Sequence, residues 1–466
     1  MIRASADTAR ALAISFAALA LSAAMLMSPA VWNGSPLYYW DSVDYVYLPF
    51  TWDLQVYRTV SYGVFAGSGR IVGSLWGVVV VQALVAAYVL RETLVVFWPG
   101  RPDRALLPLT AVLTVCTGLP WAVSQLMPDA FTGLMVLGLA ALLADAGRLG
   151  RRRWLLLVLT AIATAVHTSH IAIGAGLVVA FLVLAPFARR RWPSLRLRVA
   201  LPALTVGTAI AMVIGAHWVT IGKLQLTQPT AVLMLARLVQ DGIAKQYLDR
   251  HCAGDRPYML CRFKDRLPAT ANAFLWEHNS IVQQLGGWQK LKPEAEEILA
   301  RTLREYPWTH LGVAMRLTFE QVTRLHTGEG LVPDLAWLIR DPLKKYYPDD
   351  HAAFVASRQM SGIDFATINA LHLPLQAGMV FLLLAFGVRA WRRDDGRAVC
   401  LATATALSLF GNALVCGALS NPADRYQSRL VWLAFVGVAV AACPAGAAAQ
   451  TRARRQRNIR ATAISE

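Results

Sequence analysis

The chain has no Cys-x-x-Cys pair, so the common cysteine motif of metal sites is missing from its 466 residues. No internal repeat is visible, which argues against a transporter assembled from two inverted halves. Charged residues are also sparse within the long apolar blocks, whereas a transport pathway needs ionisable groups inside the membrane. These absences argue against a metal site built on a Cys-x-x-Cys motif and against a transporter.

Acidic residues are few as well: 28 Asp and Glu stand against 45 Lys and Arg, which gives a formal net charge of +17. A basic excess of this size can indicate a nucleic-acid partner. Here, however, most of the arginines lie in short clusters between apolar blocks, such as Arg151–Arg153 and Arg189–Arg191. This is the positive-inside pattern of membrane proteins, so we expect no nucleic-acid partner.

Apolar residues are what the sequence has in abundance, at 56% compared with about 45–50% in a soluble domain. They occur in blocks longer than the roughly 18 residues that indicate a membrane-spanning helix. These blocks predict an all-α polytopic membrane protein with about ten or eleven transmembrane helices and a mostly helical extracytoplasmic domain. The lipid bilayer is therefore the first expected partner.

The blocks divide the chain into four expected segments. They are an N-terminal transmembrane region at 1–217 with an acidic first outer loop at 32–70, an extracytoplasmic domain at 218–366, a C-terminal transmembrane region at 367–450, and a basic cytoplasmic tail at 451–466. The first apolar run looks like a signal peptide but is long for one, so we interpret it as a retained helix. The block from Trp154 to Phe187 is basic at both ends, so it must turn near its polar centre, His167–His170.

With the arginine clusters and both termini in the cytoplasm, several polar side chains share the outer face. Asp41 and Asp44 are three residues apart, so a helix would place both on one face, where they could hold a divalent cation or supply a base. Arginine's planar guanidinium matches phosphate oxygens, which makes outer arginines candidate phosphate ligands. The candidate residues are Asp41, Asp44, Asp129, His167, His170, Arg425 and Arg429.

Each candidate also has a purely structural interpretation. The first-loop acids can be solvated residues beside an interfacial aromatic belt, and Asp129 can stabilise the positive start of a helix. The two histidines can satisfy backbone groups where a helix is broken. Arg425 can pair with Asp424 or a neighbouring acid, and Arg58 can neutralise the acidic loop. Cys252 and Cys261 lie in the large polar region, where an oxidising compartment would allow a disulfide between them.

Three motifs together resemble the GT-C superfamily of membrane glycosyltransferases, in an uncharacterised bacterial branch. Acids follow the first span directly, here Asp41 and Asp44 with Tyr45; a second acid opens the fourth span in Met127-Pro128-Asp129-Ala130; and Arg425-Tyr426 precedes a late span. The sequence departs from the family in lacking an adjacent Asp-Glu pair in the first loop. It also lacks a Trp-Trp-Asp-Tyr-Gly motif, which excludes the oligosaccharyltransferase branch.

The resemblance implies an inverting enzyme that transfers a sugar from a polyprenyl-phosphate-linked donor to an extracytoplasmic glycan, lipid or protein acceptor. It implies that Asp41 or Asp44 is a base or metal ligand, that Asp129 is the second acid, and that Arg425 lies near the donor phosphate. A divalent cation, Mg²⁺ or Mn²⁺, would be held by Asp44 and Asp129. The other implied site residues are Arg429, Arg58, His167, His170, Tyr45 and Tyr426.

The same resemblance implies a location in the bacterial inner membrane, with the active face in the periplasm. Two further function classes remain open at this point. One is a transporter or flippase of lipid-linked glycans, and the other is a non-catalytic assembly protein of the cell envelope. An assembly protein would tolerate the loss of Asp41, Asp44 or Asp129 singly, whereas a glycosyltransferase would not.

Overall fold

The computed structural model describes residues 2–52, 60–98, 100–227, 231–253 and 258–443. Within these ranges the chain consists of helices and their connections. The one strand-like contact in the described residues is an isolated parallel bridge between Leu37 and Gln125. The all-α prediction is therefore confirmed.

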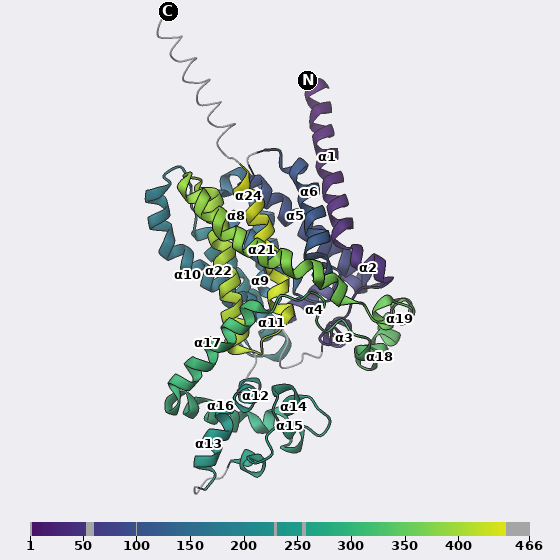
Figure 1. Cartoon of the computed structure of the whole chain (residues 1–466). Coiled ribbons are helices and arrows are strands. Elements are labelled where there is room, and N and C mark those ends of the chain that lie inside the picture. Colours follow the sequence, from purple (N-terminus) through teal and green to yellow (C-terminus); the bar gives the residue numbers. More distant parts are fainter. Residues whose placement is uncertain (1, 53–59, 99, 228–230, 254–257, 444–466) are drawn as a thin grey trace, which may run out of the picture.

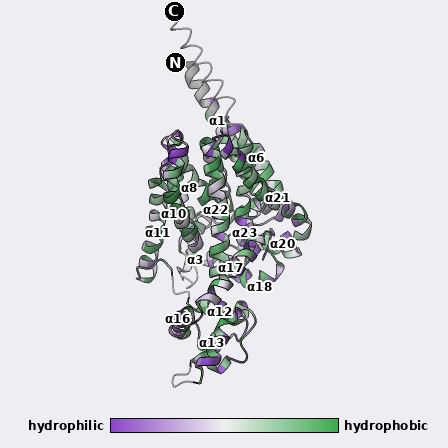
Figure 2. Ribbon diagram, turned by 60° about the vertical axis from the view of Figure 1, so that its left-hand side comes forward, coloured by the Kyte–Doolittle hydropathy of each residue, from purple (hydrophilic) through white to green (hydrophobic). Residues whose placement is uncertain are grey.

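Six of the described helices are long and apolar enough to cross a membrane. They are α5 (Trp76–Phe97), α8 (Ala130–Leu149), α10 (Thr168–Arg191), α11 (Ala200–Ile221), α21 (Phe365–Arg392) and α22 (Gly396–Leu419). Figure 2 shows apolar residues concentrated along these bundle helices. A helix with apolar residues on all sides is stable only in lipid or in a large core, so the chain is a polytopic membrane protein.

Four of the predicted spans correspond to helices outside this set of six, because their apolar stretches are shorter. They are α1 (Ile2–Leu26), whose apolar part is Leu12–Leu26, α6 (Pro102–Cys116), α9 (Arg152–Ala165) and α24 (Leu433–Ala442). The predicted turn at His167 is confirmed, because this residue is extended between α9 and α10. The total of about ten crossings remains a prediction.

Helix α8 forms the centre of the bundle, and 89% of its apolar window is buried. It contacts α5, α9, α11 and α22. Two glycines allow this close packing: a methyl group at Gly133 would overlap the Trp432 ring, and one at Gly138 would overlap Thr160. Asp129 precedes this helix directly, so the packing of α8 also determines where the Asp129 carboxylate lies.

The outer polar segment contains a small helical unit with its own apolar core. It comprises α12 (Ala231–Gln240), α13 (Ile243–His251), η1 (Met259–Phe263), α14 (Ala271–Leu275), α15 (Ile281–Gln284) and α16 (Trp288–Glu305). A disulfide joins Cys252 to Cys261 in this unit. Figure 1 shows the unit at the end of the bundle opposite the start of α1 and the end of α24.

The rest of the outer segment packs against the bundle instead. Helix α17 (Pro307–Thr323) packs along α22. The two helices approach closely at Gly417, because a methyl group on this residue would lie only 2.6 Å from the backbone oxygen of Leu317. Helix α18 (Ala336–Tyr346) contacts α3 (Ser42–Thr51), and α19 (Pro348–Val355) and α20 (Arg358–Ser361) follow it. Residues 218–366 thus form two structural parts, and the second part helps to frame the candidate site.

Candidate functional site

Two outer loops far apart in sequence are joined by the isolated bridge. The Leu37 N–H donates to Ser124 O at 3.0 Å, and the Leu126 N–H donates to Leu37 O at 2.9 Å. The Ser42 hydroxyl adds a bond to Leu126 O at 3.0 Å. These contacts fix the start of α3 beside the segment between α7 (Leu119–Val123) and α8. As a result, Asp41 and Asp129 approach the same end of the bundle.

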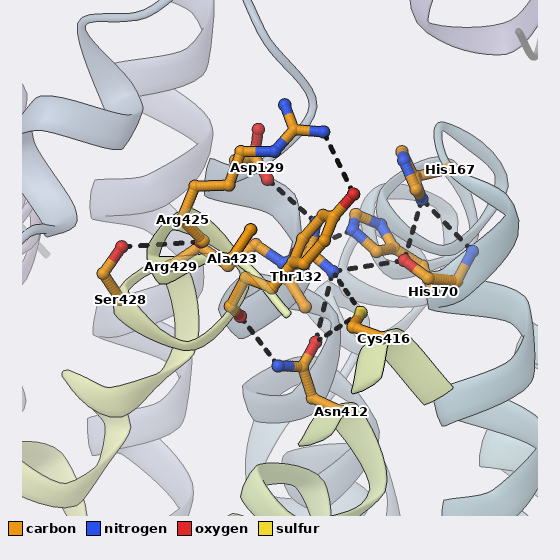
Figure 3. Close-up of polar contacts among 12 residues, drawn as sticks. Asp129, Thr132, His167, His170, Asn412, Cys416, Ala423, Arg425, Ser428 and Arg429 are labelled. Carbon is orange, nitrogen blue, oxygen red and sulfur yellow. Dashed lines mark hydrogen bonds and ion pairs between the residues drawn. The ribbon is translucent and has the colours of Figure 1, made fainter. Parts of the chain in front are cut away.

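The buried centre of the site is an ion pair between α23 (Asp424–Val431) and the start of α8. Arg429 Nη1 donates to Asp129 Oδ1 at 2.8 Å, and both side chains are almost fully buried. Arg429 Nη2 also donates to Ser169 Oγ at 3.2 Å and to Asn412 Oδ1 at 3.1 Å. Figure 3 shows Arg429 at the hub of these contacts, with Cys416 beside it.

The charge state of Asp129 follows from this environment. Burial by itself raises the pKa of Asp129, but the charges of Arg425 and Arg429 and the hydrogen bond from Arg429 outweigh it. The pKa of Asp129 is therefore lowered below its usual value, and the carboxylate stays ionised. A carboxylate held this way is a poor proton acceptor, so its role is to hold Arg429 in position.

Arg425 lies one helical turn before Arg429 and has a more open environment. Both of its terminal nitrogens are 3.4 Å from Asp41 Oδ2, which makes a long ion pair. Its guanidinium lies between two aromatic rings, 4.3 Å from the centroid of Tyr39 and 4.9 Å from that of Tyr426. Aromatic faces stabilise a partly desolvated cation, so Arg425 is held ready for an anionic partner.

A third carboxylate, absent from the sequence-based candidates, belongs to Glu329. Its Oε2 accepts the backbone N–H of Arg425 at 2.8 Å, and the residue is exposed. Glu329 lies in the short segment between α17 and α18, where Asn369 and His372 of α21 bond to Thr327. Helix α21 thus positions Glu329 through side-chain bonds to Thr327, two residues away.

A cavity of about 30 Å³ lies between these groups, and its lining includes Gln125, Asp129, Glu329, Arg425 and Arg429. This volume is roughly that of one water molecule or one hydroxyl group, and far below the ~300 Å³ of a small ligand pocket. A whole sugar ring therefore needs movement of the lining side chains in order to enter.

The two predicted histidines lie beside the site with structural partners. His167 Nδ1 caps α10 by accepting the Ser169 N–H at 3.1 Å. His170 is fully buried and lies 2.6 Å from Thr132 Oγ1 and 2.7 Å from Ala163 O. The bonds of His170 connect α10 to the start of α8 and to α9, so this histidine stabilises the packing around Asp129.

The remaining predicted residues are less central. Asp44 is buried in α3 and accepts a hydrogen bond from Tyr47 Oη at 2.9 Å, and Tyr45 packs edge-on against Tyr62 at 4.5 Å. Neither residue lines the cavity. Arg58 lies outside the residues that the structure describes. The structure therefore brings together Asp41, Asp129, Arg425, Arg429 and Tyr426, with Asp44 one helical turn farther on.

The predicted divalent cation does not fit the described part of this site. The Asp129 carboxylate already forms an ion pair with Arg429, and the charge of Arg425 acts on the same carboxylate. A metal cation at Asp129 would therefore meet two fixed positive charges. Among the described residues, no group of three or more His, Cys, Asp or Glu side chains is placed to hold a metal ion. We therefore assign no chemical step to a metal at these residues.

Sequence reasoning missed Glu329, Tyr39 as a ring partner of Arg425, and the amide of Asn412. The sequence signal for Glu329 was its place between two glycines in Thr327-Gly328-Glu329-Gly330, because paired glycines indicate close approach of the backbone to other groups. Nothing in the sequence singled out Asn412, which lies within an apolar block. Comparison with known proteins gives no relative, since no family model, curated protein or solved structure matches this chain.

Proposed function

We propose that this protein is a membrane glycosyltransferase of the bacterial inner membrane. It would transfer a sugar from a polyprenyl-phosphate-linked donor to an extracytoplasmic glycan, lipid or protein acceptor, with inversion at the anomeric carbon. The proposal rests on the motif resemblance and on one observation. Arg425 is a desolvated, ring-stacked cation at the outer end of a membrane bundle, and its partner Asp41 is only loosely bound at 3.4 Å.

The donor phosphate is the natural ligand for such an arginine. A guanidinium binds phosphate oxygens through two parallel N–H bonds, which are shorter and stronger than the long contacts to Asp41. When the bond from the sugar to phosphate breaks, negative charge develops on the phosphate oxygen that leaves. A fixed cation beside that oxygen lowers the barrier, which is the part that we assign to Arg425.

Asp41 is released from Arg425 when the phosphate binds. It is the residue that the resemblance implies as base, and its position beside the donor phosphate makes it a candidate for that role. Asp129 and Arg429 serve as the rigid support, because their buried ion pair anchors the helix that carries Arg425.

Binding of a polyprenyl monophosphate, the lipid product of the proposed reaction, tests this without knowledge of the sugar. Purified protein in lipid nanodiscs is expected to bind it, and Arg425→Ala is expected to weaken binding at least ~10-fold, since a charge-assisted hydrogen bond contributes about 1.5–3 kcal/mol. Arg316→Ala is the matched control, because Arg316 is exposed on α17 and lies outside the cavity.

Glycan analysis of a deletion strain tests the reaction itself. We expect one sugar to be missing from an envelope glycan or lipid, and to return when the wild-type gene is supplied. Unchanged glycans together with no binding of polyprenyl monophosphate would refute the proposal. An assembly protein would instead keep its role in cells when Asp41 alone is replaced by Asn.

A further inference from the structure

Three carboxylates approach Arg425 and Arg429, and their bonding differs. Asp129 is bound to the Arg429 guanidinium at 2.8 Å, and Asp41 contacts the Arg425 guanidinium. Glu329 accepts only a neutral backbone N–H, through Oε2, and the described residues give it no ion pair within 4 Å. Of the three, Glu329 is the carboxylate that contacts neither guanidinium directly.

The position of Glu329 is fixed by its loop. The Thr327 N–H donates to Asn369 Oδ1 at 2.8 Å, and Asn369 Nδ2 donates back to Thr327 O at 2.9 Å. Gly328 and Gly330 on either side both have positive φ, and a methyl group on them would overlap Phe365 and Tyr39 respectively. A loop fixed on both sides in this way holds a catalytic side chain in a defined place.

Glu329 also faces the space where a reacting group fits. It lines the cavity of about 30 Å³ together with Asp129 and Arg425, whereas Asp41 does not line it. A cavity of this size accepts a single hydroxyl group. A carboxylate within hydrogen-bond reach of that hydroxyl is placed to accept its proton.

We propose that Glu329 is the general base of the transfer and that the acceptor reacts through a hydroxyl group held in this cavity. This inference rests on the proposed glycosyltransferase function. The acceptor O–H gives its proton to a Glu329 carboxylate oxygen while the acceptor oxygen forms a bond to the anomeric carbon. The bond from that carbon to the phosphate oxygen breaks, and its electron pair stays on the polyprenyl phosphate beside Arg425.

Under this assignment Asp41 is a positioning residue. It holds Arg425 between Tyr39 and Tyr426 until the donor phosphate takes its place. Replacing Asp41 should therefore change how Arg425 binds phosphate. Replacing Glu329 should leave phosphate binding alone and stop the transfer.

Two readouts on the full-length protein separate these roles. Variants are expressed in the deletion strain to measure sugar restoration, and purified in nanodiscs to measure binding of a polyprenyl monophosphate. Glu329→Gln keeps an oxygen to accept the Arg425 N–H, so we expect binding within about twofold of wild type. We expect restoration to fall at least ~10²-fold, the usual contribution of a general base. Glu329→Asp should restore part of the loss.

Glu320→Gln is the matched control, since Glu320 is on α17, pairs with Arg324 and does not line the cavity. It should restore the sugar fully. If Glu329→Gln restores the sugar as well as wild type does, the base assignment is overturned and the glycosyltransferase proposal stands. If the wild-type protein neither binds polyprenyl monophosphate nor restores a sugar, the glycosyltransferase proposal is the one that has failed.

Discussion

At the scale of single residues, the buried pair of Arg429 and Asp129 supports the whole site. Both charges are desolvated, which costs several kcal/mol for each ion unless the partner and further hydrogen bonds compensate. Ser169 and Asn412 supply those further bonds to Arg429. Removal of either charge would leave the other one buried and uncompensated.

We predict that Asp129→Asn destabilises the protein by about 3–5 kcal/mol, because Arg429 would keep its charge in a buried place without a counter-ion. Thermal unfolding of the detergent-solubilised protein measures this loss. Asp249→Asn is the control, since Asp249 forms a solvent-exposed pair with Lys245, and exposed ion pairs contribute little to stability. Equal effects of the two substitutions would contradict the prediction.

The lowered pKa of Asp129 also predicts how the stability gap between wild type and Asp129→Asn depends on pH. A carboxylate with a lowered pKa in the folded state contributes stability that is fully present above the unfolded pKa, about 3.9, and is lost as pH falls toward the folded value. The gap should be constant from pH 7 to about pH 5 and shrink below about pH 4. A gap that shrinks between pH 7 and pH 5 would contradict this.

At the scale of elements, helix α23 and the loop at 327–331 decide the geometry. Helix α23 places Arg425 and Arg429 one turn apart on one face, so a single helix serves both the buried support and the open cation. The loop reaches this helix from α17, and α21 fixes it through Asn369 and His372. Movement of either element would separate Glu329 from Arg425.

We predict that Gly330→Ala reduces both the stability of the protein and the transfer reaction. Gly330 has φ +75°, and a methyl group there would overlap the Tyr39 ring that stacks on Arg425. The strain and the displaced ring should cost about 1–3 kcal/mol, and transfer should fall ~10-fold or more. Gly312→Ala on α17 is the control, since nothing lies within 4 Å of its methyl position. Normal transfer by Gly330→Ala would show that the loop can relax.

At the scale of the whole molecule, a membrane bundle carries a small helical unit at one end. The candidate site lies where the outer loops of the bundle meet α17 and the loop that follows it. Figure 1 shows the unit of α12–α16 joined to the bundle close to this end. Arg237 of α12 pairs with Asp241 and bonds to Asn421, three residues before α23 begins, so the unit is tied directly to the segment that carries the arginines.

We predict that the disulfide between Cys252 and Cys261 stabilises this unit and forms only where the compartment is oxidising. This disulfide closes a short loop, because its two cysteines are nine positions apart. Closing such a loop stabilises the folded unit by about 2 kcal/mol, since it restricts the unfolded chain. The double variant Cys252→Ser with Cys261→Ser should lower the unfolding temperature accordingly, and thiol counting without reductant should find this pair oxidised. Six free thiols in the native protein, in place of the four that remain when this pair is oxidised, would contradict both statements. Cys400→Ser, in α22, serves as the control for loss of a buried thiol.

The sequence by itself determined that this is an all-helical membrane protein, and it located the long apolar helices approximately. Hydropathy and arginine clusters depend only on local composition, which is why the turn at His167 and the start of α8 after Asp129 could be predicted. The sequence also identified five residues that the structure brings together: Asp41, Asp129, Arg425, Arg429 and Tyr426.

The tertiary structure alone decided which partner each of these residues has. The sequence left open whether Arg425 pairs with Asp424 or with a neighbouring acid. In the structure Asp424 bonds to His326, and Arg425 contacts Asp41, 384 positions away. Glu329 and Asn412 entered the site only through folding, because their neighbours come from α23 and no local pattern encodes that contact. Local sequence fixes where the chain crosses the membrane, whereas the packing of α8, α22 and α23 fixes which charges meet.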